Sequence, residues 1–141
     1  RLESVERLVE VRVGDLRLAS TRRARRIVET ASAPTYYLPP DDVDTSRLEP
    51  AAGLSRCEWK GEAQYWTVIV GDARLERVAW SYHDPFPPYE AVSGYFCFYP
   101  SHLDCYVDRE RARPQPGGFY GGWVTDRIVG PIKGEPGSEG W

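Results

Sequence analysis

The chain has 141 residues, a formal net charge of −3 and 41% hydrophobic residues, a size and composition that suit one soluble globular domain. Its apolar runs are far shorter than the ~20 residues that a membrane-spanning helix needs, so we exclude a helical membrane protein. The mildly acidic balance provides no general attraction to nucleic acid or to anionic lipid, and neither is an expected partner.

Residue usage and cysteine content bear on the source of the chain and on its compartment. Lys60 and Lys133 are the only lysines among 18 basic residues, and asparagine is absent, which indicates a bacterium with a GC-rich genome. The three cysteines, Cys57, Cys97 and Cys105, are an odd number in a chain without a visible secretory leader. We therefore expect reduced thiols and a cytoplasmic location.

Alternating apolar and polar residues predict strands over most of the chain. The alternation around Gly14-Asp15 predicts a hairpin that pairs Val13 with Leu16 and Val11 with Leu18. All four apolar side chains then share one face, so the register agrees with the pattern of burial.

A second hairpin is predicted about Gly71-Asp72, because the same pattern pairs Val68 with Leu75. Continued outward in this register, the ladder places Tyr65 opposite Val78. The second strand of this hairpin would then carry its large aromatic residues on the face that Tyr65 shares.

Three further segments have strand character: residues 25–30, 95–99 and 103–108. The segment 95–99 is apolar on both faces, which predicts a strand buried within the sheets. Helical character is confined to short turns near residues 42–52 and near Glu90, since proline interrupts the intervening stretches. The fold class we expect is mainly β: an antiparallel sandwich or a curved half-barrel with little helix.

The composition changes at Pro114. We expect a single β domain over residues 1–113, followed by a tail over residues 114–141 that is rich in glycine, proline and aromatic residues. Ordering such a tail costs ~1–2 kcal/mol of backbone entropy per residue, and burial of Trp123 or Trp141 could offset that cost. We expect an ordered tail that wraps over the domain or over a neighbouring subunit.

Three stretches occur in an order and spacing that resemble one known family. They are Arg26-Ile27-Val28-Glu29-Thr30 leading to Tyr36-Tyr37-Leu38-Pro39-Pro40-Asp41-Asp42-Val43, then Cys57-Glu58-Trp59-Lys60-Gly61-Glu62-Ala63-Gln64-Tyr65-Trp66, then Ala79-Trp80-Ser81-Tyr82 with Pro85. With these motifs the chain resembles the bacterial domain of unknown function 427 family over about residues 9–107. The pattern Cys-x-x-Lys-Gly-x-Ala-x-Tyr-Trp is the specific element of this resemblance.

The resemblance implies no catalytic residues. The family is sometimes labelled nucleotidyltransferase-like, yet the sequence has no glycine-serine phosphate loop that opens a helix and no Asp-x-Asp pair on a strand to hold Mg²⁺. Cysteine and histidine do not occur in Cys-x-x-Cys or His-x-x-x-His spacing, so no metal site is predicted. The sequence therefore indicates no particular cofactor.

Lys60, Glu29 and Cys57 are the candidate catalytic residues. Lysine can be tuned by burial into a base or a nucleophile, whereas arginine cannot, and Lys60 stands inside the specific motif. Glu29 would act as an acid or base, and Cys57, three residues before Lys60, as a reactive thiol. The alternatives are a surface lysine beside Gly61, an ion pair between Glu29 and an arginine, and a packed cysteine.

Arg26, Tyr37, Trp66, Trp80 and Tyr82 are the candidate ligand-binding residues. Trp80 and Tyr82 share a face of their strand, and the aromatic residues together could line a concave pocket for a planar or cationic small molecule. The alternative is a hydrophobic core that is rich in aromatic residues.

Residues 22–26 form the only block of like charge, with four arginines around Ala24. A contact to phosphate or nucleic acid is one interpretation of this block. The alternative is a solvent-exposed edge strand, which charged side chains protect from pairing with another chain.

Three functions remain open at this point. The leading hypothesis is binding of a small metabolite in a pocket lined by the aromatic residues. The second is an enzyme that uses Lys60 with Glu29 or Cys57 for acid–base or covalent chemistry. The third is an assembly protein whose aromatic tail forms the contacts of a homodimer.

Overall fold

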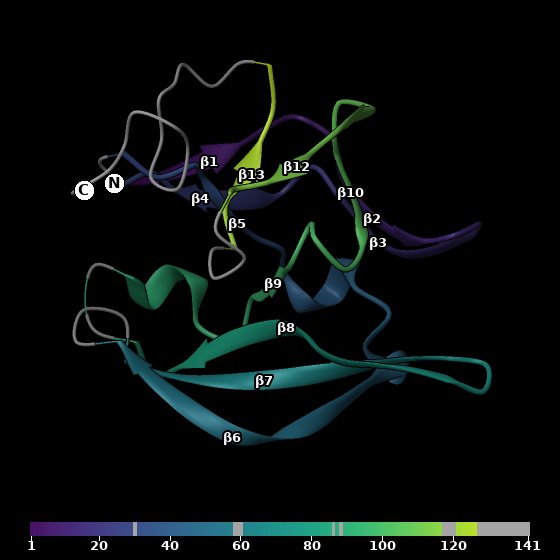
Figure 1. The fold of residues 1–141 in the computed structure, drawn as a ribbon. Helices are drawn as coiled ribbons and strands as arrows, with labels where there is room; N and C mark the ends of the chain where they lie inside the picture. Colours follow the sequence, from purple (N-terminus) through teal and green to yellow (C-terminus); the bar gives the residue numbers. More distant parts are fainter. Residues whose placement is uncertain (30, 58–60, 86, 88, 117–120, 127–141) are drawn as a thin grey trace.

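The computed structural model describes residues 1–29, 31–57, 61–85, 87, 89–116 and 121–126, and of residues 54–57 and 61 it describes the backbone (Figure 1). The chain is mainly β, as the alternation predicted. Its elements are β1 (Leu2–Val5), β2 (Val9–Val13), β3 (Leu16–Thr21), β4 (Ala24–Ile27), β5 (Thr35–Tyr37), η1 (Pro40–Asp42), η2 (Thr45–Arg47), β6 (Leu48–Cys57), β7 (Gly61–Val70), β8 (Ala73–His83), η3 (Tyr89–Val92), β9 (Phe96–Phe98), β10 (Asp104–Val107), β11 (Glu110–Arg111), β12 (Arg113–Pro114) and β13 (Trp123–Val124). None of the described helices has the length and apolar character needed to cross a membrane.

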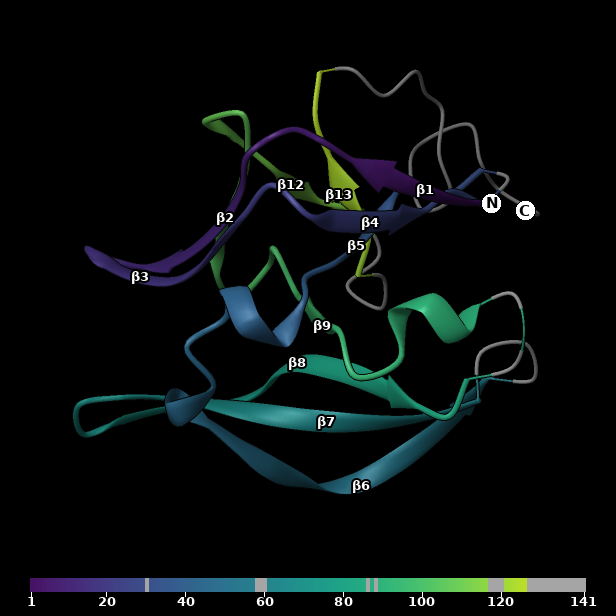
Figure 2. The ribbon, with the colours of Figure 1, turned by 180° about the vertical axis from the view of Figure 1, so that it is seen from behind.

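Two antiparallel sheets join into one bent sheet. Strands β1, β4 and β5 form a three-stranded sheet, and β6, β7, β8 and β9 form a four-stranded one. A bridge connects them: the Leu38 and Phe96 backbones exchange two N–H to C=O hydrogen bonds of 2.9 Å. The resulting strand order is β1-β4-β5-β9-β8-β7-β6, which we call the long sheet. It bends at β9, so that β4 and β5 lie above β7 and β8 in Figures 1 and 2.

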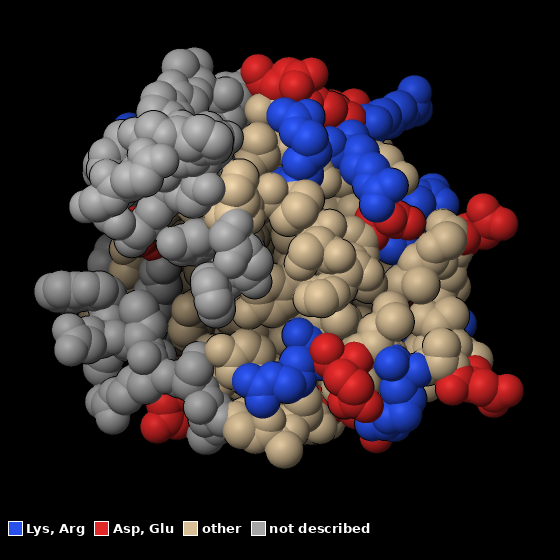
Figure 3. All heavy atoms as spheres, viewed as in Figure 1, with Lys and Arg blue, Asp and Glu red and all other residues tan. Residues whose placement is uncertain are grey.

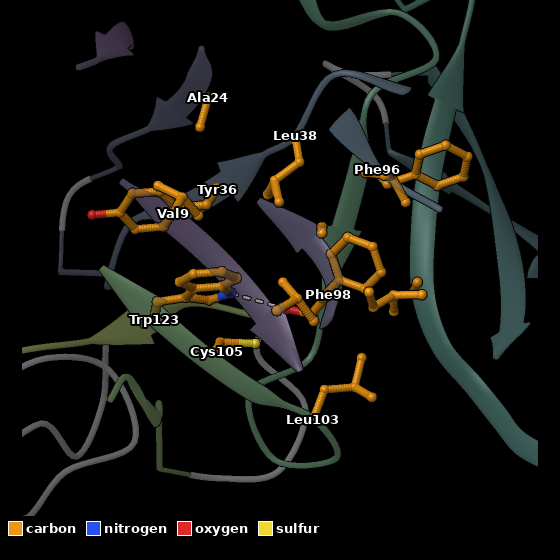
Figure 4. Close-up of a cluster of buried hydrophobic side chains, with 14 of the residues drawn as sticks. Val9, Ala24, Tyr36, Leu38, Phe96, Phe98, Leu103, Cys105 and Trp123 are labelled. Atoms are coloured by element: carbon orange, nitrogen blue, oxygen red, sulfur yellow. Dashed lines mark hydrogen bonds between the residues drawn. The ribbon is translucent and has the colours of Figure 1, made fainter. Parts of the chain in front are cut away.

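A second sheet covers one face of the long sheet and encloses the main core. Its strand order is β11-β10-β2-β3. The core between the two sheets contains Val9, Leu38, Phe98 and Trp123, all almost completely buried (Figure 4). The Trp123 indole N–H donates to the Phe98 carbonyl at 2.9 Å, so this large side chain enters the core with its polar atom satisfied.

The first predicted hairpin is confirmed at its turn and corrected further along. Val13 pairs with Leu16, and Gly14 takes the positive φ of 58° that the tight turn requires. Val11, however, pairs with Ala19 and not with Leu18, because a bulge between Val11 and Arg12 adds one residue to the ladder.

The second predicted hairpin is likewise confirmed at its turn and corrected further along its strands. Val68 pairs with Leu75 as predicted. A register shift between Trp66 and Val68 then sets Tyr65 opposite Trp80, so the expected pairing of Tyr65 with Val78 is wrong. Arg77 has a φ of 53° at this point, a left-handed conformation that is unusual for a residue with a Cβ atom.

The remaining strand predictions hold in outline. The segment 95–99 contains β9, which has β8 on one side and Leu38 on the other, so it is internal as predicted. The predicted strand 25–30 is shorter, since β4 ends at Ile27. The short helical turns are present, but β6 begins at Leu48, inside the segment 42–52 where helical turns were expected.

Candidate ligand-binding site

The long sheet has two buried faces, and they differ in chemistry. Along β5 and β9 the residues alternate between them: Leu38 and Phe98 face the main core, whereas Tyr37 and Cys97 face the opposite side. The opposite side carries a second cluster, which we call the tyrosine cluster. Its buried members are Ile27, Tyr37, Ala63, Trp80, Val92 and Cys97, and half-buried Leu2, Tyr65, Tyr82, Tyr89, Tyr95 and Tyr99 pack around them.

Tyr37 stands at the centre of the tyrosine cluster. It is 1% exposed, and its ring stacks on that of Tyr82 with centroids 6.4 Å apart. Burial raises the pKa of the Tyr37 phenol far above its ordinary value, and the neighbouring Cys97, Tyr82 and Glu29 groups add to that rise. The phenol therefore stays protonated, with the Cys97 side chain as a hydrogen-bond partner and the Glu29 side chain close enough to act on it electrostatically.

Trp80 forms the second half of the cluster. Its ring packs on Tyr99 with centroids 4.6 Å apart. On another side it meets the backbone of Gly121: a Cβ atom added to that glycine would lie 2.1 Å from Cη2 of the indole. Burial raises the pKa of Tyr99 to about 12, so this phenol is also protonated at neutral pH. Nearby, the Arg77 guanidinium lies 4.2 Å above the centre of the Tyr65 ring.

A cavity of about 200 Å³ adjoins the tyrosine cluster, and we call it the Glu29 cavity. Three contacts connect the two: Ile27 belongs to both, Gly121 packs on Trp80, and Glu29 acts on Tyr37. The wall combines a carboxylate, two hydroxyl groups and an amide. Its described residues are Ile27, Glu29, Ser32, Ala33, Thr35, Gln115, Gly121 and Gly122.

Two residues from the C-terminal part of the chain, Gln115 and Trp123, form hydrogen bonds to the turn after β4 beside this cavity. Gln115 is 2% exposed and its Oε1 accepts from the Ala33 N–H at 3.0 Å, while the Trp123 N–H donates to the Pro34 carbonyl at 2.8 Å. Gly122 is also closely packed, because an added Cβ would lie 2.7 Å from Gln115 Oε1. The two glycines therefore let the backbone approach Trp80 and Gln115 more closely than a residue with a Cβ atom could.

The structure brings together some of the predicted site residues. Tyr37, Trp80 and Tyr82 share the tyrosine cluster, and Glu29 lies beside them at the cavity. Lys60 lies outside the described residues. Cys57 ends β6, where its backbone pairs with Gly61, and its side chain is likewise outside the described part of the chain.

Arg26 and Trp66 lie on the core side of the long sheet, away from this cluster. The Arg26 guanidinium donates to Glu3 Oε1 at 2.8 Å, so the arginine's ion pair is with Glu3. The Trp66 indole N–H donates to Ser81 Oγ at 2.9 Å, and its ring meets Phe96 edge to face. Adjacent strand residues point to opposite faces, which separates Trp66 from Tyr65.

Other wall residues escaped the sequence analysis. Ser32 is a small polar residue in the turn after β4, Thr35 begins β5, and Gln115 lies more than 80 positions from the Ala33 that it binds. The pair Gly121-Gly122 was visible only as part of a glycine-rich composition. The adjacent glycines before a tryptophan are the one local signal of a close backbone approach at this place.

Asp42 and Asp44 form an Asp-x-Asp pair beside η1, and both carboxylates are already engaged. Asp42 accepts hydrogen bonds from Thr21 and Arg23, which lower its pKa, and Asp44 accepts from Ser46 and Arg47. Within the described ranges, no group of three or more histidine, cysteine, aspartate or glutamate residues is placed to hold a metal ion.

Comparison with known proteins identifies a family for this chain. A search of curated proteins found none that matches the chain. A family profile described as "Domain of unknown function (DUF427)" matches residues 1–109, which is more than half of the 141 residues. The matched region contains β1 to β10, and with them the long sheet, Glu29 and the tyrosine cluster. The resemblance that the three sequence motifs indicated is thus confirmed, and the chain belongs to the DUF427 family.

Proposed function

We propose that the protein binds a small polar metabolite in the Glu29 cavity, which adjoins the tyrosine cluster. One observation carries this proposal. A carboxylate, two hydroxyl groups and an amide line a space of about 200 Å³ beside protonated tyrosines. Small-molecule sites combine an apolar surface with a few polar groups that fix orientation, and this wall supplies the polar groups together with the apolar side chains of Ile27 and Ala33.

The polar wall favours a site over a packing defect. Its side chains include Glu29, Ser32, Thr35 and Gln115, each of which can form hydrogen bonds with a ligand. A space of about 200 Å³ is smaller than the ~300–1,000 Å³ typical of sites for drug-sized ligands, which favours a small metabolite. The described wall carries a hydrogen-bond acceptor of negative charge in Glu29, which suits a ligand that presents N–H or O–H donors.

The other two hypotheses have less support in the described residues. The enzyme hypothesis depends on Lys60 and on the Cys57 thiol, and it stays a prediction. The assembly hypothesis loses Trp123 as a contact residue, because that indole is 1% exposed and bonded within its own chain. It depends instead on Trp141, outside the described residues.

Native mass spectrometry of the purified protein, followed by ligand screening with amide NMR spectra, tests the proposal. Glu29→Gln keeps the size of the side chain and removes its charge. Glu49→Gln, at an exposed ion pair with Arg74, is the matched control. We expect a retained or added small molecule that shifts the amides of Ser32 and Thr35, binds Glu29→Gln at least about tenfold more weakly, and binds the control unchanged.

Two outcomes would overturn the proposal. One is a library of polar metabolites that leaves every amide around the cavity unshifted at millimolar concentration. The other is a ligand whose affinity falls equally in Glu29→Gln and Glu49→Gln, since loss of any surface charge would then explain the effect.

A further inference from the structure

The arginine block at residues 22–26 does not form an edge strand. Strand β4 lies between β1 and β5, hydrogen-bonded on both sides, so the expectation of a charged, protective edge is wrong. Edge protection therefore does not account for these four arginines, and each has a different environment.

The surroundings of the four arginines differ because successive residues of a strand point to opposite faces of the sheet. Arg23 precedes β4 and forms an ion pair with Asp42. Arg25 stands across from Tyr37, and Arg26 points to the opposite face of the strand, where it binds Glu3. Arg22 has no hydrogen bond or ion pair with any residue that the structure describes.

Arg22 lines a groove of about 450 Å³ together with two other arginines. Arg7 comes from the connection between β1 and β2, Arg22 from the connection between β3 and β4, and Arg26 from β4 itself. Ser4 adds a hydroxyl group to the same wall, and the acidic residues of the wall are Glu6 and Asp108.

Two of the three guanidinium groups are held in place. Arg26 Nε is 2.8 Å from Glu3 Oε1, and Arg7 Nη1 is 3.0 Å from Asp108 Oδ2. Asp108 is itself fixed, because its Oδ1 accepts the Leu8 N–H at 2.9 Å. A guanidinium has five N–H donors, and each of these carboxylate contacts uses only part of that set. Arg26 Nη1 also donates to the Tyr36 hydroxyl at 3.5 Å. The donors of Arg7 and Arg26 that these contacts leave unused, together with the guanidinium of Arg22, are available to a bound oxyanion.

We propose that this groove binds a small oxyanion of the phosphate class, either inorganic phosphate or a phosphomonoester. Arg7 is paired with Asp108 and Arg26 with Glu3, so Arg22 is the arginine of the wall that has no carboxylate partner among the described residues. Arginine suits this role because its planar fork of donors matches the oxygens of a phosphoryl group.

The charge distribution favours a small anion over a nucleic acid. The chain carries a net charge of −3, and on the face shown in Figure 3 acidic and basic side chains alternate without a broad basic patch. Nucleic-acid binding depends on many phosphate contacts along a continuous basic surface. Three arginines within one groove provide contacts for a single phosphoryl group.

The test is an amide NMR titration at constant, low ionic strength with three probes: inorganic phosphate, glycerol 3-phosphate and a short single-stranded oligonucleotide. We expect the first two to shift the amides of Ser4, Arg7 and Arg22 with saturation. Arg22→Gln should weaken phosphate binding at least about fivefold, because it removes charge-assisted hydrogen bonds. Arg74→Gln removes an exposed arginine from the β7–β8 hairpin and should leave the affinity unchanged.

Equal effects of Arg22→Gln and Arg74→Gln would overturn the proposal, since the response would then reflect total charge. Tighter binding of the oligonucleotide that depends on Arg22 would also overturn it, in favour of a nucleic-acid surface. Amide shifts confined to residues outside the groove would exclude the site. A dispersed spectrum for each variant shows that it is folded, so a loss of binding is not confused with a loss of structure.

Discussion

The backbone of Gly121 packs against the indole of Trp80 so closely that a Cβ atom on the glycine would lie 2.1 Å from Cη2. This contact joins residues that are 41 positions apart and places the wall of the Glu29 cavity on the tyrosine cluster. Even a single methyl group added at residue 121 should therefore change the stability of the protein measurably.

Gly121→Ala should destabilise the fold by about 1–3 kcal/mol, because the added methyl group forces Trp80 or the backbone to move. The free energy of unfolding in urea measures the effect. In a double-mutant cycle, the same alanine introduced into Trp80→Leu should cost clearly less, since the atom that it meets is gone. Additive effects of the two substitutions would contradict the contact.

Trp123→Phe should destabilise the protein by about 2–4 kcal/mol. The smaller ring leaves a cavity in the main core, and the Phe98 carbonyl loses its indole donor. Urea unfolding of the variant measures the loss. Val124→Ala, which shortens the half-buried neighbour on β13, should cost much less. An equally small loss for both variants would mean that Trp123 contributes little to the core.

Tyr37→Phe should change how the stability depends on alkaline pH. The folded state raises the pKa of the Tyr37 phenol above its ordinary value of about 10, so the phenol's contribution is fully present below pH 10. Above that pH the unfolded chain loses the proton first, and the contribution falls by up to about 1.4 kcal/mol for each pH unit.

The measurement is the free energy of unfolding in urea between pH 8 and pH 11.5. The wild-type protein should lose stability more steeply above pH 10 than Tyr37→Phe does. Tyr106→Phe, on β10 and outside the tyrosine cluster, serves as the control and should follow the wild-type slope. Parallel slopes for wild type and Tyr37→Phe would show that the phenol ionises equally well in the folded state.

Thr67→Val should cost about 1 kcal/mol. The Thr67 hydroxyl accepts from the Arg77 N–H at 3.4 Å and donates to Glu76 Oε2 at 3.0 Å, and these bonds span the register shift of the β7–β8 hairpin. Valine keeps the shape of the side chain and removes both bonds. Thermal unfolding checks the loss, with Thr45→Val in the exposed η2 as the control. A stability equal to that of the control would show that the hydroxyl does not hold the bulge.

Local pattern was enough to predict the strand class, both hairpin turns and the internal position of β9. It failed at the two bulges, because one extra residue changes every pairing beyond it while leaving the alternation of apolar residues almost intact. The pairing of Tyr65 therefore moved from Val78 to Trp80. The signals for a bulge, a positive φ at Arg77 and a hydroxyl at Thr67, acquire meaning only from the partner strand.

The candidate site was predictable where it depends on one strand and its neighbour, and not where it depends on distant segments. Trp80 and Tyr82 share a face by alternation alone, and Tyr37 joins them on the tyrosine face. Gln115 reaches the cavity through the chain's overall path, which no local pattern contains. Trp66 misled the prediction because a large aromatic residue beside Tyr65 in sequence lies on the other side of the sheet.

Successive residues of β5 point to opposite faces of the long sheet and so belong to different clusters. Tyr36 and Tyr37 are successive residues, yet Tyr36 packs on Trp123 in the main core, with ring centroids 4.8 Å apart, while Tyr37 forms the centre of the tyrosine cluster. Because Tyr36 and Tyr37 share a peptide unit, a ligand that shifts the backbone at Tyr37 would also shift the ring of Tyr36 against Trp123. A change in tryptophan fluorescence on ligand binding would report this coupling between the two faces of the sheet.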